Sequence, residues 1–148
     1  QVVPLAAVLT PNHFEAEVLT ERKIGSVAEA ADACKALHAR GPHTVVITSL
    51  QLSRGGDGGD GGGGGGASPT DDTIVMVASR RDETGVVLQW ALTLPRLPQH
   101  FTGTGDLTSA LFLAWSDRLP LPHQLAEVLE RVGASLQALL QATRAAGR

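Results

Sequence analysis

Apolar positions in the first fifty residues follow two different rhythms. Residues 2–10, VVPLAAVLT, form a short apolar run typical of a buried strand, although Pro4 weakens its start. A second apolar run, HTVVITS at 43–49, predicts another buried strand. Between the two runs the apolar positions recur with helical spacing. Strand, helix and strand in this order predict a parallel crossover and therefore an α/β fold.

Two helix starts lie between these strands. Asn12 precedes Glu15 by three residues, and Ser26 precedes Glu29 by the same interval, which is the spacing of a capping box. The first helix places Phe14, Val18 and Leu19 on one face. The second helix carries an apolar stripe of Ala30, Ala33, Cys34 and Leu37 and ends at Gly41 and Pro42.

The second half of the chain predicts a hairpin and two more helices. Residues 73–79 and 86–94 are strand-like and are joined by a polar turn, so this pair is antiparallel and the sheet is mixed. Trp90 and Trp115 lie on apolar patterns and are expected in the core. The helical stripes are Leu107, Ala110, Leu111 and Ala114, and then, after a start near Pro122, Leu125, Val128, Leu129, Val132, Leu136, Leu139 and Leu140. We expect the last stripe to lie on a sheet or on another subunit.

Residues 54–69, RGGDGGDGGGGGGASP, predict a flexible surface loop. A segment with this much glycine cannot offset the entropy that it would lose on ordering. A phosphate-binding loop would also need a lysine and a helix leaving it, and an EF-hand loop would need a closing glutamate. The segment contains no lysine and no glutamate, and no helical pattern follows it.

The composition argues against several functional classes. The 148 residues carry a net charge of −3, which disfavours a nucleic-acid or anionic-membrane partner held by bulk charge. No apolar run approaches the ~20 residues of a membrane span, and no basic segment precedes the apolar start as it would in a signal peptide. The single cysteine excludes an internal disulfide and fits a reducing cytosol, so we expect a cytoplasmic protein. The five histidines lack zinc-site spacing and are interpreted as surface or structural residues.

Gly103, Thr104, Gly105 and Asp106 stand immediately before the helical run that starts at Leu107. Two glycines let the backbone come close to a ligand, and the first N–H groups of a helix have no internal partner. Such a site suits a phosphate or a developing oxyanion. Asp106 would repel a passively bound phosphate, but it could orient an attacking hydroxyl and accept its proton late. The structural alternative is that Asp106 only favours the helix start through the helix dipole.

Four further polar residues stand at strand ends or helix starts. Asn12 and Glu15 are explained either by capping or by contact with the phosphates of a nucleotide, with Glu15 holding Mg²⁺ through water. Thr48 and Ser49 either cap a turn or face a ligand, because ligands bind at the carboxyl edge of open α/β sheets. All of these groups would fall on one sheet edge.

Three blocks, VVPLAAVLTPNHFEAEVLT, GPHTVVITS and FTGTGDLTSALFLAW, occur in the order and at roughly the spacing seen in pyridoxal kinases of the ribokinase-like superfamily. The chain resembles about the C-terminal half of that family. The resemblance implies a three-layer α/β/α fold with a mostly parallel sheet and an antiparallel hairpin, in which residues 1–148 are the nucleotide-binding and catalytic half of one domain. It also implies ATP-dependent phosphorylation of the 5′-hydroxymethyl group of pyridoxal, pyridoxine or pyridoxamine, by proteins that are typically cytoplasmic homodimers.

The resemblance assigns roles to the glycine-rich helix start. Asp106 matches the catalytic base of the family. Gly103, Thr104 and Gly105 match its phosphate-facing anion hole.

The resemblance also covers the polar residues at the strand ends. Thr10, Asn12 and Glu15 match the block that contacts cations and nucleotide phosphates in the family, and Thr48 and Ser49 match its nucleotide-contacting pair. The divalent cation, Mg²⁺ or another, is expected at Glu15. A monovalent cation, K⁺ or Na⁺, is expected at Thr10 and Thr48.

The main departure from the family is length. The N-terminal strands, which hold most of the vitamin pocket and its lid in the family, have no counterpart here, and the chain starts at Gln1 rather than Met. We therefore expect a fragment that is inactive alone. Two alternatives stay open: a hydroxymethylpyrimidine kinase, which uses the same loop and acid, and a non-catalytic remnant that binds nucleotide or a partner subunit through its C-terminal helices.

Overall fold

The computed structural model describes residues 3–52, 73–96 and 103–147. In chain order the elements are β1 (Val8–Leu9), α1 (His13–Thr20), α2 (Val27–His38), β2 (Thr44–Leu50), β3 (Thr73–Arg81), β4 (Val87–Pro95), α3 (Thr104–Arg118) and α4 (Leu125–Ala146), with 3-10 turns at Val3–Leu5 and Pro122–Gln124. The predicted loop at 54–69 lies outside the described residues. None of the helices in the described part is long and apolar enough to cross a bilayer.

The described strands form one mixed sheet in the order β1-β2-β3-β4. β1 is parallel to β2, with Val8 opposite Thr44, whereas β3 is antiparallel to β2 and β4 is antiparallel to β3. The predicted crossover, hairpin and mixed sheet are confirmed. The expected excess of parallel pairing is not found among these strands, because β3 starts at the sheet edge where β2 ends and runs back along it.

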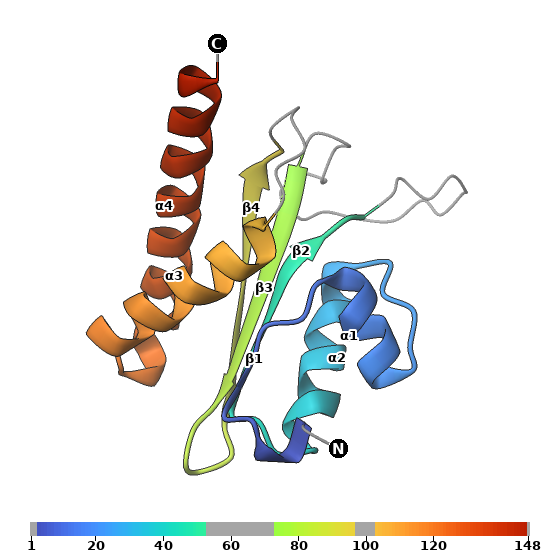
Figure 1. Cartoon of the computed structure of the whole chain (residues 1–148). Coiled ribbons are helices and arrows are strands. Elements are labelled where there is room, and N and C mark those ends of the chain that lie inside the picture. Colours follow the sequence, from blue (N-terminus) through green and yellow to red (C-terminus); the bar gives the residue numbers. More distant parts are fainter. Residues whose placement is uncertain (1–2, 53–72, 97–102, 148) are drawn as a thin grey trace, which may run out of the picture.

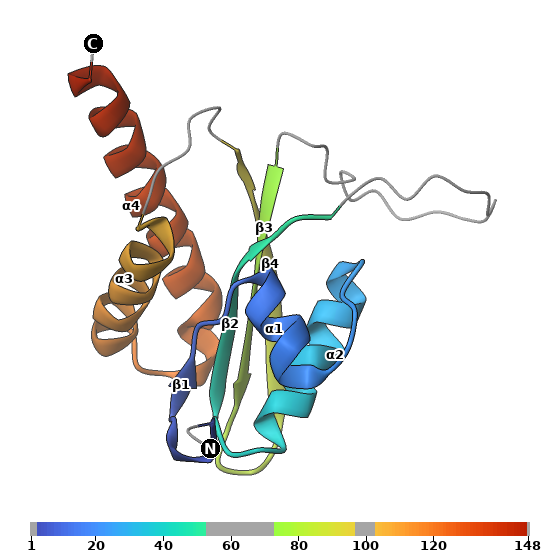
Figure 2. The same cartoon turned by 45° about the vertical axis from the view of Figure 1, so that its right-hand side comes forward.

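Helices cover both faces of the sheet, so the predicted three-layer α/β/α arrangement is confirmed (Figures 1 and 2). α1 and α2 lie on one face, where the stripe of α2 packs on Val45 and Ile47 of β2. α3 and α4 lie on the other face, where they pack on Val46 of β2 and Met76 of β3. The two apolar clusters follow from the alternation of side chains along a strand, which sends neighbouring residues to opposite faces.

The N-terminal apolar run is not the buried strand that its sequence predicts. Within its described part only Val8–Leu9 forms a strand, after the 3-10 turn at Val3–Leu5. Pro4 has no N–H to donate to a ladder, and β1 lies at the edge of the described sheet. Leu5 is 85% exposed and Val8 is 36% exposed, so the run is not buried either.

The α1 apolar face, formed by Phe14 and Val18, is also uncovered. These side chains are 72% and 58% exposed, whereas Ala16 on the opposite side of the helix is fully buried. Together with β1, this face is an apolar region that none of the described elements covers.

The buried face of α3 is rotated from the predicted one. Thr108 and Phe112 are buried, and Leu111 and Trp115 pack beside them, whereas the predicted Ala110 and Ala114 are exposed. Burying a Phe or Trp side chain removes far more apolar area from water than burying a methyl group. The aromatic residues therefore set which face of the helix meets the sheet.

α4 approaches β4 closely through Gly133, which is buried. A Cβ at this position would lie 2.8 Å from Leu92 Cδ2 and 3.0 Å from Leu94 Cδ2. Leu125, Val128, Leu129 and Val132 bury the first part of the predicted stripe against the sheet. The stripe does not stay buried to its end, because Leu139 is 46% exposed.

His38 is buried at the end of α2 and is structural, as expected. Its Nδ1 lies 2.8 Å from the carbonyl oxygen of Pro42, and its Nε2 lies 2.8 Å from Ser79 Oγ. A carbonyl oxygen only accepts, so Nδ1 carries the proton and Ser79 donates to Nε2. Ser79 in turn accepts from Gln89 Nε2 at 3.1 Å. Burial lowers the pKa of His38, because the charged ring would lose its hydration.

Candidate functional site

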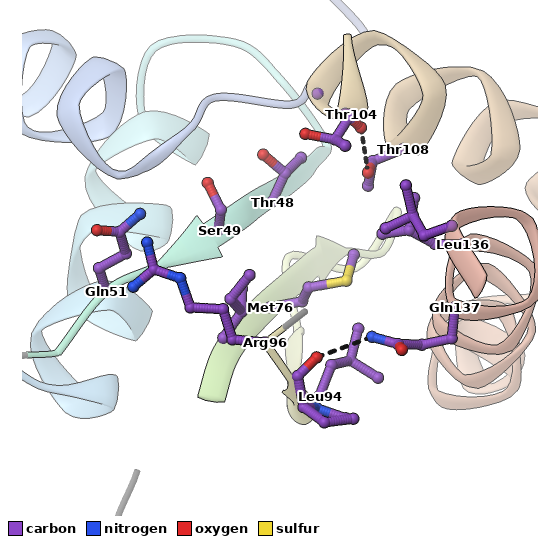
Figure 3. Close-up of a pocket in the computed structure, with 14 residues that line it drawn as sticks. Thr48, Ser49, Gln51, Met76, Leu94, Arg96, Thr104, Thr108, Leu136 and Gln137 are labelled. Carbon is purple, nitrogen blue, oxygen red and sulfur yellow. Dashed lines mark hydrogen bonds between the residues drawn. The ribbon is translucent and has the colours of Figure 1, made fainter. Parts of the chain in front are cut away.

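A cavity of about 220 Å³ lies at the sheet edge where β2 ends and where β3 and α3 begin (Figure 3). Thr48 and Ser49 from β2 and Thr104 and Gly105 from α3 contribute polar groups to its wall. Leucines from β4 and α4 contribute apolar groups: Leu94, Leu136 and Leu140. The structure therefore brings two predicted pairs together, Thr48 with Ser49 and Thr104 with Gly105, although they are far apart in the sequence.

The α3 N-terminus is open toward this cavity. Gly103 is the N-cap, with φ of 82° and ψ of 6°, a left-handed conformation that glycine adopts without a Cβ penalty. Gly103 has no side chain, so no side-chain hydrogen bond caps the helix. The first N–H groups of α3 thus keep their capacity to donate, and the dipole adds positive potential at the same place. These properties suit an anion such as a phosphate.

Asp106 lies in the first turn of α3 and is exposed. Its neighbours Thr104 and Gly105 line the cavity, whereas Asp106 stands beside that lining. In the third position of a helix, a carboxylate can reach back to the backbone of the N-cap. Glu15 does so in α1, but Asp106 has no hydrogen bond or ion pair within the described part of the chain. A capping box therefore does not account for Asp106, whereas its favourable interaction with the helix dipole requires no such bond.

Asn12 and Glu15 form the capping box that their spacing predicts. Asn12 Oδ1 accepts from the backbone N–H of Glu15 at 2.9 Å, and Glu15 Oε2 accepts from that of Asn12 at 2.9 Å. Ser26 makes the corresponding bond in α2, but Glu29 accepts from the N–H of Gly25 instead of that of Ser26. The structural explanation thus holds for these residues, and it leaves Glu15 Oε1 without a hydrogen bond among the described residues.

Asn12 lies close to the cavity without lining it. Asn12, Ser49 and Gln51 line a second, open hollow, and Ser49 and Gln51 also line the cavity. The two hollows therefore meet at the end of β2. This arrangement agrees with the prediction that Asn12 and Ser49 fall on one sheet edge.

One hydrogen bond joins α3 to the residue that follows β1, and a second joins the segment after β1 to β2. The hydroxyls of Ser109 and Thr10 are hydrogen-bonded at 2.9 Å, and the N–H of Thr48 donates to the carbonyl of Pro11 at 3.0 Å. Thr10 and Thr48, the expected cation contacts, thus belong to one region together with the N-terminal part of α3. Within the described residues, no group of three or more His, Cys, Asp or Glu side chains could hold a metal ion.

The cavity wall also contains residues that the motifs did not single out. Arg96 follows β4, and Gln137 lies on α4, where its Nε2 donates to the carbonyl of Pro95 at 2.9 Å. Gln137 Oε1 is buried and has no hydrogen-bond partner within the described residues. The leucine stripe of α4 could have indicated that this helix lines the cavity, because the stripe continues to Leu140, beyond the part that covers the sheet.

Cys34 is not a candidate nucleophile, since burial raises the pKa of its thiol to about 12.

Comparison with known protein families shows which family the chain belongs to. The family model described as phosphomethylpyrimidine kinase matches residues 1–118. The chain belongs to this family. The pyridoxal kinase of Arabidopsis thaliana is 40% identical over 144 residues, an alignment that covers 97% of this chain and 40% of that protein. The pyridoxal kinase of Homo sapiens is 36% identical over 148 residues, covering 97% of this chain and 42% of that protein.

Solved structures of pyridoxal kinases share the fold. The pyridoxal kinase from Leishmania donovani in complex with ADP superposes with a TM-score of 0.76 at 27% identity, over 96% of this chain and 44% of that one. The pyridoxal kinase from Trypanosoma brucei gives a TM-score of 0.74 at 26% identity, over 97% and 44% of the two chains. The expected ribokinase-like fold is confirmed, and the chain spans about 40% of the length of the curated relatives it matches.

Proposed function

We propose that this chain is the nucleotide-binding and catalytic part of a pyridoxal kinase. In this proposal it acts in the transfer of phosphate from ATP to the 5′-hydroxymethyl group of pyridoxal, pyridoxine or pyridoxamine. The names of the relatives support the reaction class, and structures of the Leishmania donovani enzyme with ADP and with pyridoxine support the two ligand classes. The chain would form part of a single domain, because no described element covers its sheet edge at β1 or the α1 apolar face.

The free carboxylate of Asp106 is the observation that carries this proposal. Glu15 and Glu29 also lie near helix starts, and both accept backbone N–H bonds there. Asp106 has the same position in α3 and accepts no such bond from the residues that the structure describes. A carboxylate beside an open anion-binding helix end has a chemical use in phosphoryl transfer.

In the proposed reaction, Asp106 orients the alcohol and accepts its proton. The alcohol oxygen forms a bond to the γ-phosphorus, the bond from that phosphorus to the β,γ-bridging oxygen breaks, and ADP leaves. The backbone N–H groups of Gly103, Thr104 and Gly105 would stabilise the charge on the equatorial oxygens of the transferred phosphoryl group. Thr48 and Ser49 would bind the nucleotide at the same wall.

The residues near Asn12 could supply part of the ligands of a divalent cation, and the phosphates of the nucleotide would supply others. Mg²⁺ is commonly held by one or two carboxylates together with substrate phosphates and waters. Glu15 can offer Oε1, since only Oε2 is used in the capping box. We assign Mg²⁺, or another divalent cation, to Glu15, where it would neutralise phosphate charge, and a monovalent cation, K⁺ or Na⁺, to the hydroxyls of Thr10 and Thr48.

Three properties of the whole protein belong to the same proposal. The whole protein would be cytoplasmic and would form a homodimer. The isolated 148-residue chain would not phosphorylate the vitamin. The last expectation follows from the share of the relatives that the chain spans, 40% to 42%. Vitamin phosphorylation by the isolated chain would contradict it.

The decisive experiment is Asp106→Asn in a protein that carries this chain together with the remaining part found in its relatives. Turnover should fall by about 10²-fold or more, as for removal of a general base, while the dissociation constant for ATP stays within a factor of about two. Asp117→Asn, in the last turn of the same helix, removes an equal charge and should leave turnover unchanged. Normal turnover in Asp106→Asn would overturn the assignment, and an unsubstituted protein that binds ATP without turnover would indicate a non-catalytic remnant.

One observation favours a second candidate, a hydroxymethylpyrimidine kinase. The family model that matches residues 1–118 is described as phosphomethylpyrimidine kinase. The same helix end and acid would serve, because both acceptors carry a primary alcohol on an aromatic ring. Parallel assays with pyridoxal and hydroxymethylpyrimidine decide between them. The first candidate requires the higher kcat/KM for pyridoxal.

A further inference from the structure

Arg96 is the cationic side chain in the described wall of the cavity. Arg96 directly follows Pro95, the last residue of β4. It therefore lies at the same sheet edge as the C-terminal end of β2 and the start of α3. Figure 3 shows its side chain extending toward Gln51 and Ser49, away from the leucines of the apolar wall. The guanidinium therefore belongs to the polar half of the cavity.

No acid neutralises Arg96 within the described residues. Three other cations of the described chain have carboxylate partners: Lys23 with Glu17 at 2.9 Å, Lys35 with Asp32 at 2.9 Å, and Arg131 with Glu127 at 3.3 Å. Arg96 shares the lack of such a partner with other described arginines, but it is the one that lines the cavity. Arg96 takes part in no ion pair or hydrogen bond in this part of the chain, and its described cavity wall contains no Asp or Glu.

Several other polar groups of this wall can donate hydrogen bonds, while the unpartnered Gln137 Oε1 is an acceptor beside the leucines. Thr48 and Ser49 offer hydroxyls, and the N-terminus of α3 offers backbone N–H groups at Thr104 and Gly105. A guanidinium adds a planar set of N–H donors that matches two oxygens of a phosphate. Donors from three separate elements and an unpaired positive charge thus surround one space.

We propose that Arg96 binds the phosphate chain of the nucleotide and neutralises part of its charge. This inference rests on the proposed kinase function and deepens it, since it names the protein's own cation for the polyphosphate. Arg96 is a binding residue for the phosphates, and the apolar wall receives the uncharged part of the nucleotide.

The test compares ADP with adenosine, which lacks the phosphates, by calorimetric titration of the 148-residue chain. Arg96→Gln should weaken ADP binding by about tenfold or more, because a charge-assisted, two-point contact is lost, and should leave adenosine binding unchanged. Arg96→Lys keeps the charge without the planar donor set, so its affinity for ADP should lie between those of the unsubstituted chain and Arg96→Gln. Arg131→Gln makes the same change in net charge outside the cavity and serves as the control.

Each outcome bears on the inference in a distinct way. If the unsubstituted chain binds neither ADP nor adenosine, the proposed function fails in this chain, and the role of Arg96 fails with it. If ADP binds equally to the unsubstituted chain and to Arg96→Gln, only the role of Arg96 is overturned. If Arg96→Gln weakens adenosine as much as ADP, Arg96 supports the cavity wall and does not bind phosphate, which also overturns the inference.

Discussion

The hydroxyls of Ser109 and Thr10 are hydrogen-bonded at 2.9 Å, a link between residues 99 positions apart. Ser109 lies one turn after Asp106 on α3, and Thr10 immediately follows β1. The bond therefore fixes the first turns of α3 relative to the end of β1, where the expected cation contact Thr10 lies. It couples the two parts of the candidate site directly.

A double-mutant cycle on this pair tests the link. Ser109→Ala and Thr10→Val each remove one hydroxyl, and urea unfolding of the chain measures the free energy of unfolding. We expect a coupling energy of about 0.5–1.5 kcal/mol, the usual net contribution of such a bond. Strictly additive effects would show that the two hydroxyls do not interact.

The buried His38 makes stability dependent on pH. Its pKa is lowered in the folded chain by burial, so the unfolded chain binds more protons between the folded pKa and the ordinary value near 6.5. Stability from this group is therefore fully present above about pH 6.5 and is lost as the pH falls below that value. Arg81 and His43 also lower this pKa, and the Pro42 carbonyl opposes them.

Comparison with His38→Gln isolates this effect from the other histidines. The difference in free energy of unfolding between the original chain and the variant should be constant from pH 8 to 7 and should shrink as the pH falls below 6.5. Chemical denaturation at each pH supplies the values. A difference that grows on acidification would contradict the buried, neutral state of His38.

Gly41 combines two requirements for glycine. Its φ is 134°, and a Cβ would lie 2.9 Å from the Cα of Pro4. Gly41→Ala should therefore cost about 2–4 kcal/mol, as strain and a backbone clash add.

Two other glycines are matched controls for Gly41. Gly85 has a φ of 88° with open space around it, so Gly85→Ala should cost about 1 kcal/mol from strain alone. Gly25 shows no positive φ and only a 3.4 Å contact with a side-chain atom, so its Ala variant should be close to neutral. Thermal unfolding of the three variants should give this order, and a Gly41→Ala chain as stable as the Gly25→Ala chain would refute the argument.

The α1 apolar face should tolerate polar substitution. Phe14→Gln with Val18→Gln should change the free energy of unfolding by less than about 0.5 kcal/mol, since both side chains are mostly exposed. The same substitution at Ala16, which is fully buried in the same helix, should prevent stable folding. Urea unfolding provides the measurement, and binding of a hydrophobic dye should fall only in the double variant at Phe14 and Val18.

Local features of the fold could be predicted from the sequence because they depend on neighbours along the chain. Asn12 and Glu15 cap α1 across three residues, and the polar turn between β3 and β4 makes their antiparallel pairing unavoidable. The short β1 could not be predicted, because strand length depends on pairing with residues such as Thr44 that are distant in sequence. The phase of α3 failed for another reason: alanines fit either face, and Phe112 decided it.

The candidate site divides in the same way. Thr48 and Thr104 were placed on one sheet edge because strand ends and helix starts collect there in α/β folds, and both line the cavity. Arg96 and Gln137 carry no motif. Arg96 reaches the cavity from the end of β4, and Gln137 reaches it through the packing of α4 on β4, and no spacing in the sequence records either placement.

The missing side chain of Gly133 has an effect beyond its own position. Leu136, Gln137 and Leu140, which follow it within two turns of α4, form one wall of the cavity. The depth at which α4 settles on Leu92 and Leu94 therefore sets how wide that opening is. A single methyl group added at 133, outside the cavity lining, would push this wall outward and change the fit of a molecule bound there.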